Sequence, residues 1–140
     1  MSGADGDPIA AFYDRHPYPA PIDELDAEVA SWGDGLRRRV EHARLWPSLP
    51  YRDDHTILVA GCGTSQAARY AVRYPNASVL GIDVAESSLD ATRRLQERYA
   101  LENLELQQLS IEEARSIGRH FDHIVCTGVL HHLREPGAGL

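Results

Sequence analysis

The sequence predicts an α/β fold in which helices cover a doubly wound, parallel sheet. Three observations support this prediction. From residue 56 onward, short apolar runs alternate with segments of helical periodicity, as expected when helices connect parallel strands. A glycine-rich turn of Gly61, Cys62 and Gly63 directly follows the first apolar run. The second apolar run ends in Asp83, at a strand terminus where a carboxylate is able to accept ribose hydroxyls.

The predicted strands are short and apolar. They are expected at four places: 56–60, 78–82, 104–109 and 121–126. Because these runs are apolar on both faces, helices should cover both sides of the sheet. Right-handed crossovers then place a nucleotide site at the carboxyl ends of the strands.

The predicted helices have recognisable start and stop signals. The helix at 65–74 ends at Pro75, which cannot continue it. The helix at 88–101 has Ser87 as its N-cap and separates an apolar face from a charged one. The sequence Ser110-Ile-Glu-Glu113 is a capping box that opens a short helix.

Residues 1–54 differ in amino-acid composition from residues 55–140, and we expect them to form a leader segment before the sheet domain. The leader holds six of the eight prolines and both tryptophans. Prolines bias the stretch from Phe12 to Pro21 toward irregular or extended backbone. A helix is predicted at 34–46, with Leu36, Val40, Ala43 and Trp46 along one face.

Two features of the leader have alternative interpretations. The run Arg37-Arg38-Arg39 is more typical of a solvated helix face than of a substrate contact. Tyr13 and Tyr18 either cover a bound ligand as a lid or pack the leader onto the sheet, and packing is slightly favoured.

Composition excludes several classes of function. A net charge of −7 argues against nucleic acid as the main partner, because phosphate binding needs a basic field. All fourteen basic residues are arginine, which excludes a catalytic or phosphate-binding lysine. The two cysteines, Cys62 and Cys126, lack metal-ligand spacing. No signal-peptide pattern or membrane-length apolar run occurs, so a cytoplasmic location is predicted.

The motifs from residue 56 onward together resemble the class I S-adenosylmethionine-dependent methyltransferases. Gly61-Cys-Gly-Thr64 resembles that family's first motif, and residues 80–89 its second-strand motif. Residues 106–113 occupy its third-strand position, and residues 121–133 resemble its fourth-strand motif. The aromatic, proline-rich stretch at 12–21 is similar to the leader of a bacterial subgroup. The resemblance implies a Rossmann-like sheet and S-adenosyl-L-methionine as the cofactor.

The resemblance also implies a role for individual residues. The turn of Gly61, Cys62 and Gly63 would lie under the methionine and ribose parts of the cofactor, with Cys62 as a small filler rather than a nucleophile. Asp83 would hold both ribose hydroxyls and Val84 would pack on the adenine. The remaining cofactor contacts would be Ser110 and Ile111 at the adenine edge and Thr127 near the methionine.

This chain departs from the family pattern at three positions. Val59 stands where the family usually has an acidic residue near the cofactor amino group. Ser65 replaces the third glycine of the first motif, and Ser110 replaces the carboxylate at the adenine edge. Each departure removes one expected contact with the cofactor.

The family sheet has seven strands in the order 3-2-1-4-5-7-6, whereas this sequence supplies strands 1 to 4. We therefore expect a partial chain, with much of the cofactor cleft present and much of the acceptor pocket absent. In such a chain the fourth strand would be an open apolar edge.

Three functions are compatible with the sequence. The first is methyl transfer to a small-molecule or protein acceptor. The second is a non-catalytic remnant that binds the cofactor or serves as an interaction module. The third is a nicotinamide-dependent oxidoreductase, against which Gln66 argues because the dinucleotide motif needs glycine or alanine there. For the adjacent His131 and His132, a structural or loop role is favoured over a substrate-side or proton-transfer role, and a metal site is least expected, since neighbouring residues cannot share one helix or strand face.

Overall fold

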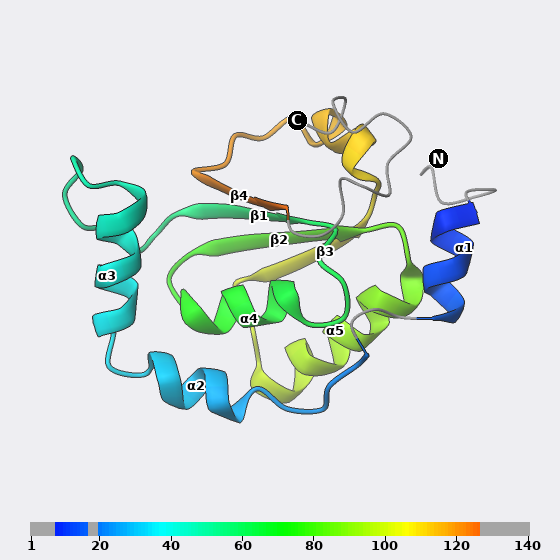
Figure 1. The fold of residues 1–140 in the computed structure, drawn as a ribbon, viewed down its shortest axis with the longest axis horizontal. Coiled ribbons are helices and arrows are strands. Elements are labelled where there is room, and N and C mark those ends of the chain that lie inside the picture. Colours follow the sequence, from blue (N-terminus) through cyan, green and yellow to red (C-terminus); the bar gives the residue numbers. More distant parts are fainter. Residues whose placement is uncertain (1–7, 17–19, 127–140) are drawn as a thin grey trace.

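A computed structural model describes residues 8–16 and 20–126 of the protein. Four strands form one parallel sheet in the order β3-β2-β1-β4 (Figure 1). They are β1 (Thr56–Ala60), β2 (Ser78–Asp83), β3 (Leu104–Gln108) and β4 (His123–Cys126). This order equals that of the first four strands of the methyltransferase sheet, which confirms the predicted fold class.

The register of the sheet brings the carboxyl ends of the strands to one edge. On β1, Ala60 pairs with Ile82 of β2 and with Cys126 of β4. On β2, Asp83 pairs with Gln108 of β3. The loops that follow β1, β2 and β3 therefore begin side by side.

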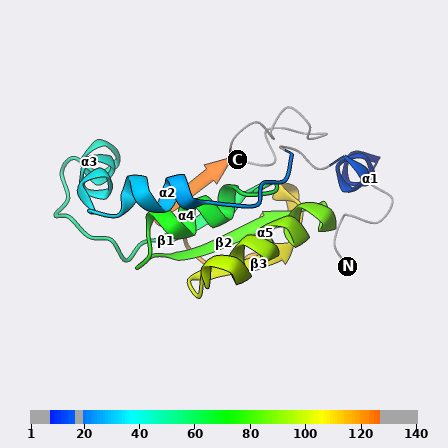
Figure 2. The same cartoon turned by 90° about the horizontal axis from the view of Figure 1, so that it is seen from below.

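Helices cover both faces of this sheet. One face packs against α4 (Gln66–Arg73) and α5 (Glu86–Tyr99), which lie next to each other in Figure 2. The other face packs against a 3₁₀ helix, η1 (Ile111–Ile117). Each face has its own apolar core, one around Val59, Val79 and Leu89, the other around Leu58, Leu80 and Ile82.

Small residues allow α4 to lie close to β2. Ala67, Ala68 and Ala71 of α4 are almost completely buried. Gly81 lies opposite them, and a Cβ at that position would be 2.7 Å from the Ala67 Cβ and 3.0 Å from the Leu106 side chain. Gly81 is therefore required by the close approach of helix and strand.

The described part of the leader contains three helices, of which the sequence predicted one. They are α1 (Pro8–Arg15), α2 (Asp26–Trp32) and α3 (Leu36–Leu45). The irregular backbone expected from Phe12 onward was wrong as far as Arg15, because the residues that precede His16-Pro17 complete a helix that starts at Pro8, a favourable first position. Trp32 and Leu25 are buried where α2 meets the sheet domain.

The apolar face predicted for α3 does not face the core. Leu36 is 62% exposed and Val40 is 51% exposed, whereas His42 is buried. Of the four residues predicted for this face, only Trp46 is not exposed, because the contact at this end of the sheet is made by residues with rings.

This contact is a cluster of rings at the amino ends of β1 and β4. The Trp46 ring stacks on His55 with 4.3 Å between centroids, and His42 lies 5.5 Å from His55. The edge of His123 approaches Trp46 at 5.9 Å. The buried Nε2 of His42 has no hydrogen-bond partner among the described residues, and His42 lines a small pocket together with Trp46 and His55.

Two further predictions about the helices were only partly right. The 88–101 helix begins earlier, at Glu86, with Ala85 as its N-cap, so Ser87 lies inside the first turn. Arg37 and Arg39 of the arginine run are exposed, as predicted. Arg38 is half-buried and donates hydrogen bonds to the carbonyls of Trp32 and Arg73 at 2.8 and 3.0 Å.

Within the described residues, no helix is both long and apolar enough to cross a membrane.

Candidate functional site

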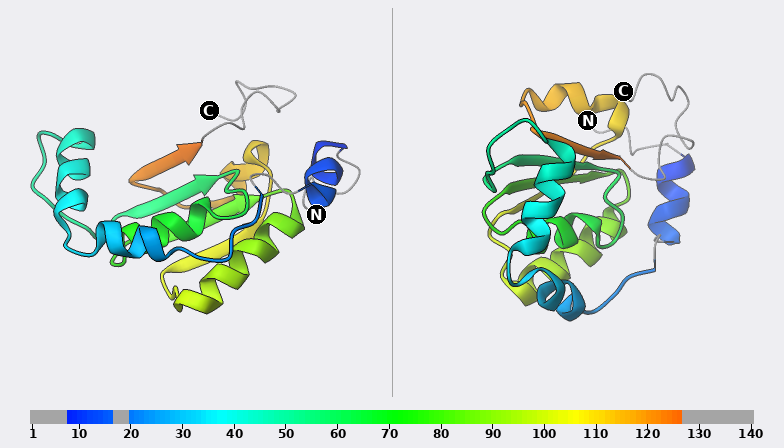
Figure 3. Two further views of the ribbon diagram at one scale, coloured as in Figure 1. Left: turned by 60° about the horizontal axis from the view of Figure 1, so that its bottom comes forward. Right: turned by 60° about the vertical axis from the view of Figure 1, so that its left-hand side comes forward.

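The turn after β1 is shaped by glycines and held by backbone hydrogen bonds. Gly61 and Gly63 adopt φ values of 66° and 59°, a region that favours glycine. The Cys62 amide donates to the Ile82 carbonyl at 2.9 Å, which ties the turn to β2. The two glycines therefore place backbone without side chains at the carboxyl edge of the sheet, where Figure 3 shows the strand arrowheads.

Asp83 connects this turn to the next one. Its Oδ2 accepts a hydrogen bond from the Gly63 amide at 2.9 Å, and its Oδ1 accepts one from the Ala85 amide at 2.9 Å. The Val84 amide also faces this carboxylate, and a carboxylate has about four acceptor positions, so at least one remains for a ligand. The carboxylate is thus fixed in orientation and still able to accept a hydrogen bond from a ligand hydroxyl.

The environment of Asp83 disfavours its charge. Burial raises the pKa of this carboxyl, and hydrogen bonds from the Ala85, Gly63 and Val84 amides oppose that effect. A carboxyl whose pKa is raised while several donors face it is typical of functional sites.

Cys62 lies beneath the turn. Its side chain is 1% exposed, and a Cβ at Gly81 would lie 3.3 Å from its sulfur. Burial and the nearby Asp83 charge raise the pKa of the thiol, so it is not a reactive thiolate at neutral pH. The interpretation of Cys62 as a filler fits this position, and it leaves only its backbone to face a ligand.

The end of β3 is joined to the same region. The Leu109 amide donates to the Asp83 carbonyl at 3.0 Å, and the Gln108 side-chain amide donates to the Val84 carbonyl at 3.0 Å. These bonds bring Ser110 and Ile111, which directly follow Leu109, toward the Asp83–Val84 turn.

The N-cap half of the predicted capping box at Ser110 is confirmed. The Ser110 Oγ accepts from the Glu113 amide at 3.2 Å and donates to a Glu113 carboxylate oxygen at 2.8 Å. With its proton used in this way, the hydroxyl has only acceptor capacity left for a ligand. Ile111 is buried against the core beneath η1. Its backbone and the remaining Ser110 lone pair are the groups available at an adenine edge.

Sequence reasoning missed two residues that shape the site. The Thr92 hydroxyl, from α5, is shared between the carbonyls of Gly63 at 3.2 Å and Ser88 at 3.0 Å. Gln108 was treated only as part of a strand. A polar residue on the buried face of a helix, as at Thr92, is the sequence signal that could have indicated such a role.

The start of α4 presents backbone amides at the same edge. Ser65 is its N-cap residue but makes no side-chain hydrogen bond to the helix amides. The Gln66 amide donates to the Cys62 carbonyl at 3.2 Å, and Ala67 and Ala68 are fully buried. The helix N-terminus still carries a partial positive charge, which favours a nearby carboxylate.

Other predicted residues lie outside the described parts of the structure. These are Thr127, Tyr18, His131 and His132, and the side chain of Tyr13 is likewise not described. Among the described residues, no group of three or more histidine, cysteine or acidic side chains could hold a metal ion.

Comparison with known proteins decides the family. Residues 58–140 match the protein family described as a methyltransferase domain. The chain belongs to this family. An uncharacterised protein of Synechococcus is 31% identical over 134 residues, which cover 94% of this chain and 32% of that protein. The ubiquinone biosynthesis O-methyltransferase of Acinetobacter baylyi is 27% identical over 135 residues, covering 86% of this chain and 54% of that enzyme.

Two solved structures with S-adenosylhomocysteine bound share the fold. The N-terminal domain of EvdMO1, crystallised with S-adenosylhomocysteine, is 28% identical with a TM-score of 0.59, covering 74% of this chain and 42% of that one. PKMT2 from Rickettsia typhi, in complex with the same compound, is 27% identical with a TM-score of 0.53, covering 60% of this chain and 16% of that one. S-adenosylhomocysteine is what S-adenosylmethionine becomes after it loses its methyl group. S-adenosylmethionine is therefore the cofactor that this methyltransferase domain implies, and the chain spans only part of the length of these relatives.

Proposed function

We propose that this chain supplies the cofactor-binding part of an enzyme that transfers a methyl group from S-adenosylmethionine to a small-molecule or protein acceptor. The observation that carries the proposal is the Asp83 carboxylate, which backbone amides hold at the edge of the sheet with acceptor capacity left for a ligand hydroxyl. A ribose hydroxyl can donate to a carboxylate held in this way.

Several described residues would contact such a cofactor. Asp83 would accept the ribose hydroxyls, and Val84 and Ile111 would flank the adenine. The turn of Gly61 and Gly63 would lie under the ribose and methionine, and the positive end of the α4 dipole would favour the methionine carboxylate. The cofactor supplies an already activated methyl group on a sulfonium. The chain's contribution is then mainly to orient the reactants and exclude water.

The nature of the acceptor is inferred from charge. A net charge of −7 makes a nucleic-acid acceptor unfavourable, because its phosphates would be repelled. The acceptor atom is not fixed by the relatives, one of which is named as an O-methyltransferase. Both cysteines are free, which supports a reducing, cytoplasmic setting.

Isothermal titration of the chain with S-adenosylhomocysteine tests the cofactor assignment, with NAD as the competing dinucleotide and circular dichroism to verify folding. We expect binding of the first compound and none of the second. Tighter binding of NAD would support an oxidoreductase instead, and a folded chain that binds neither would contradict the assignment.

Transfer itself needs a separate assay. Radiolabelled S-adenosylmethionine is incubated with the protein and with fractionated small molecules or proteins, and transfer of label is followed. Incorporation identifies the acceptor class. Cofactor binding without incorporation in any fraction would favour a non-catalytic binding module.

A further inference from the structure

The leader contacts both loops of the cofactor site through carboxylates. On one side, the Asp14 carboxylate of α1 accepts a hydrogen bond from the Ser87 amide at 2.9 Å. Ser87 lies in the first turn of α5, two residues beyond Ala85, whose own amide donates to Asp83. Figure 1 shows α1 beside the start of α5, at the carboxyl edge of the sheet. The turn at 83–87 is thus held by one carboxylate from the strand and one from the leader.

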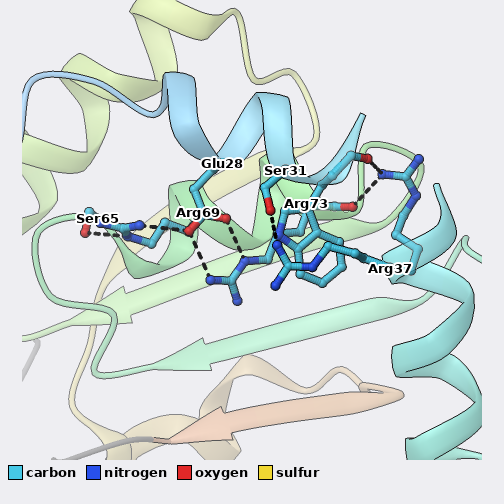
Figure 4. A network of polar contacts seen from close by, with 8 residues as sticks. Glu28, Ser31, Arg37, Ser65, Arg69 and Arg73 are labelled. Carbon is cyan, nitrogen blue, oxygen red and sulfur yellow. Dashed lines mark hydrogen bonds and ion pairs between the residues drawn. The ribbon is translucent and has the colours of Figure 1, made fainter. Parts of the chain in front are cut away.

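On the other side, Glu28 of α2 reaches the first loop through an arginine. Its carboxylate accepts hydrogen bonds from Arg69 at 2.8 Å and from Arg73 at 3.0 Å, both on α4 (Figure 4). The Arg69 Nε donates a hydrogen bond to the Ser65 hydroxyl oxygen at 3.4 Å. A continuous polar chain therefore runs from the leader to the last residue before α4.

The position of Ser65 makes this chain possible. Its φ of −152° is negative, so glycine is not required there. Its hydroxyl is buried and points to Arg69 rather than to the helix amides. A glycine at 65, as in the usual first motif, would leave Arg69 without this contact.

We propose that Glu28 and Asp14 are positioning residues through which the leader fixes the two loops that hold the cofactor. This inference rests on the proposed function, since it assigns both carboxylates to the same cofactor cleft. Neither is placed in contact with the cofactor. Each acts on a residue adjacent to the site, Glu28 on Ser65 through Arg69 and Asp14 on Ser87.

Burial gives the Glu28 contact its strength. The Glu28 side chain is 14% exposed, and the two guanidinium groups that converge on it are 35% and 27% exposed. Such charge-assisted bonds are stronger than exposed ion pairs because water competes less. Without the Glu28 charge, Arg69 and Arg73 repel one another and Arg69 is no longer held next to Ser65.

Glu28→Gln tests the first contact, with Glu41→Gln as a matched control. Glu41 is also in the leader, but its partner is Arg44 in an exposed pair on α3, away from the cleft. We expect Glu28→Gln to weaken binding of S-adenosylhomocysteine by about 2-fold to 30-fold. Hydrogen exchange of the amides at 61–66 should accelerate by a comparable factor without ligand. Glu41→Gln should leave both unchanged.

A double-mutant cycle distinguishes positioning from general stabilisation. Ser65→Ala removes the hydroxyl and leaves the leader intact. If Glu28 acts through Arg69 and Ser65, the effects of Glu28→Gln and Ser65→Ala on affinity will be less than additive. Additive effects would overturn the relay. Should Glu28→Gln destabilise the fold, Ser65→Ala alone still tests the contact, and unchanged exchange at 61–66 would refute it.

Asp14→Ala tests the second contact, with Asp34→Ala as its control. Asp34 also accepts a backbone amide at the start of a helix, that of Leu36 at 3.1 Å, but on α3. We expect faster exchange of the Ser87 amide and weaker ligand binding only in Asp14→Ala. Asp14→Asn keeps an acceptor oxygen and should restore both.

The ligand-free measurements separate the two proposals. If the wild type does not bind S-adenosylhomocysteine, the proposed function fails while the exchange data still report on the contacts. If the wild type binds and the Glu28 and Asp14 variants bind equally well, the function stands and the positioning roles are wrong.

Discussion

The two ends of the sheet each have an aspartate that accepts backbone amides, and the two differ in a revealing way. Asp122, before β4, accepts the Thr56 amide at 2.9 Å and joins the amino ends of two strands. Asp83, at the carboxyl end of β2, joins two loops. The Thr56 amide lowers the pKa of Asp122, whereas burial raises the pKa of Asp83.

These opposite directions have opposite consequences for stability. A lowered pKa means that ionised Asp122 stabilises the fold above its unfolded pKa near 3.8, an effect lost as pH falls through the folded value. A raised pKa means that ionised Asp83 lowers the stability of the fold above that pH. The charge of Asp122 at the amino end thus stabilises the fold. The charge of Asp83 at the carboxyl end destabilises the fold, and a ligand could stabilise it.

The largest expected effect separates the two aspartates. Asp83→Ala should weaken binding of S-adenosylhomocysteine by at least about a hundredfold, because two hydrogen bonds to a charged group contribute roughly 1.5–3 kcal/mol each. Asp122→Ala should lower stability but leave the affinity of the folded protein unchanged. Calorimetric titration of both variants tests this. Equal losses of affinity would mean that Asp83 has no special role.

Packing beneath the site gives the next largest effect. Gly81→Ala should lower the free energy of unfolding by about 1–3 kcal/mol, since the new methyl group would overlap with Ala67. Gly33→Ala is the matched control, because its Cβ would meet only carbonyl oxygens at 3.4 Å or more. Urea denaturation measures both.

A compensating change sharpens that test. Ala67→Gly in the Gly81→Ala background removes the opposing methyl group and should restore part of the lost stability. If stability does not recover, the overlap lies elsewhere, for instance at Leu106.

The ring cluster at the amino end should produce a smaller, pH-dependent effect. Burial lowers the pKa of His55 and of His123. The unfolded chain therefore binds more protons, so stability is complete above about pH 6.5 and falls as pH drops below it, by about 1.4 kcal/mol per unit of lowered pKa. Urea unfolding at about pH 7.5 and about pH 5.5 measures the loss.

Two phenylalanine variants assign this effect to the cluster. His55→Phe keeps a ring against Trp46 and should reduce the pH dependence. His16→Phe changes a histidine that is stacked on Phe12 but exposed, and should not. If the wild type and both variants show the same pH dependence of stability, His55 is not its source.

The smallest effect is expected on the exposed face of α3. Leu36→Gln should change the free energy of unfolding by less than about 0.5 kcal/mol, because Leu36 is 62% exposed. Thermal unfolding suffices to measure it. A loss well above this value would show that the apolar face of α3 is covered in solution.

Much of the sheet domain could be predicted because its signals are local. The apolar runs, Pro75 and the capping box at Ser110 each act within a few residues. The spacing from Gly61 to Asp83 likewise predicted that the turn and the carboxylate would meet, and the Gly63 amide is bonded to Asp83. The helical start of α5 was misplaced because Ala85 offers no capping side chain of its own, and the described contact to the Ser87 amide comes from Asp14.

By itself, the sequence determined the parallel order of the strands, the glycine turn and the carboxylate at its edge. Only the tertiary structure decided which groups hold them. Asp14, Glu28 and Thr92 contact the site loops from elements far away in the chain. Likewise, His42 lies on the buried side of α3, whereas Leu36 is exposed. Helix and strand periodicity depend on neighbours within a turn or two, whereas such contacts depend on where separate elements are brought by packing, which no local pattern encodes.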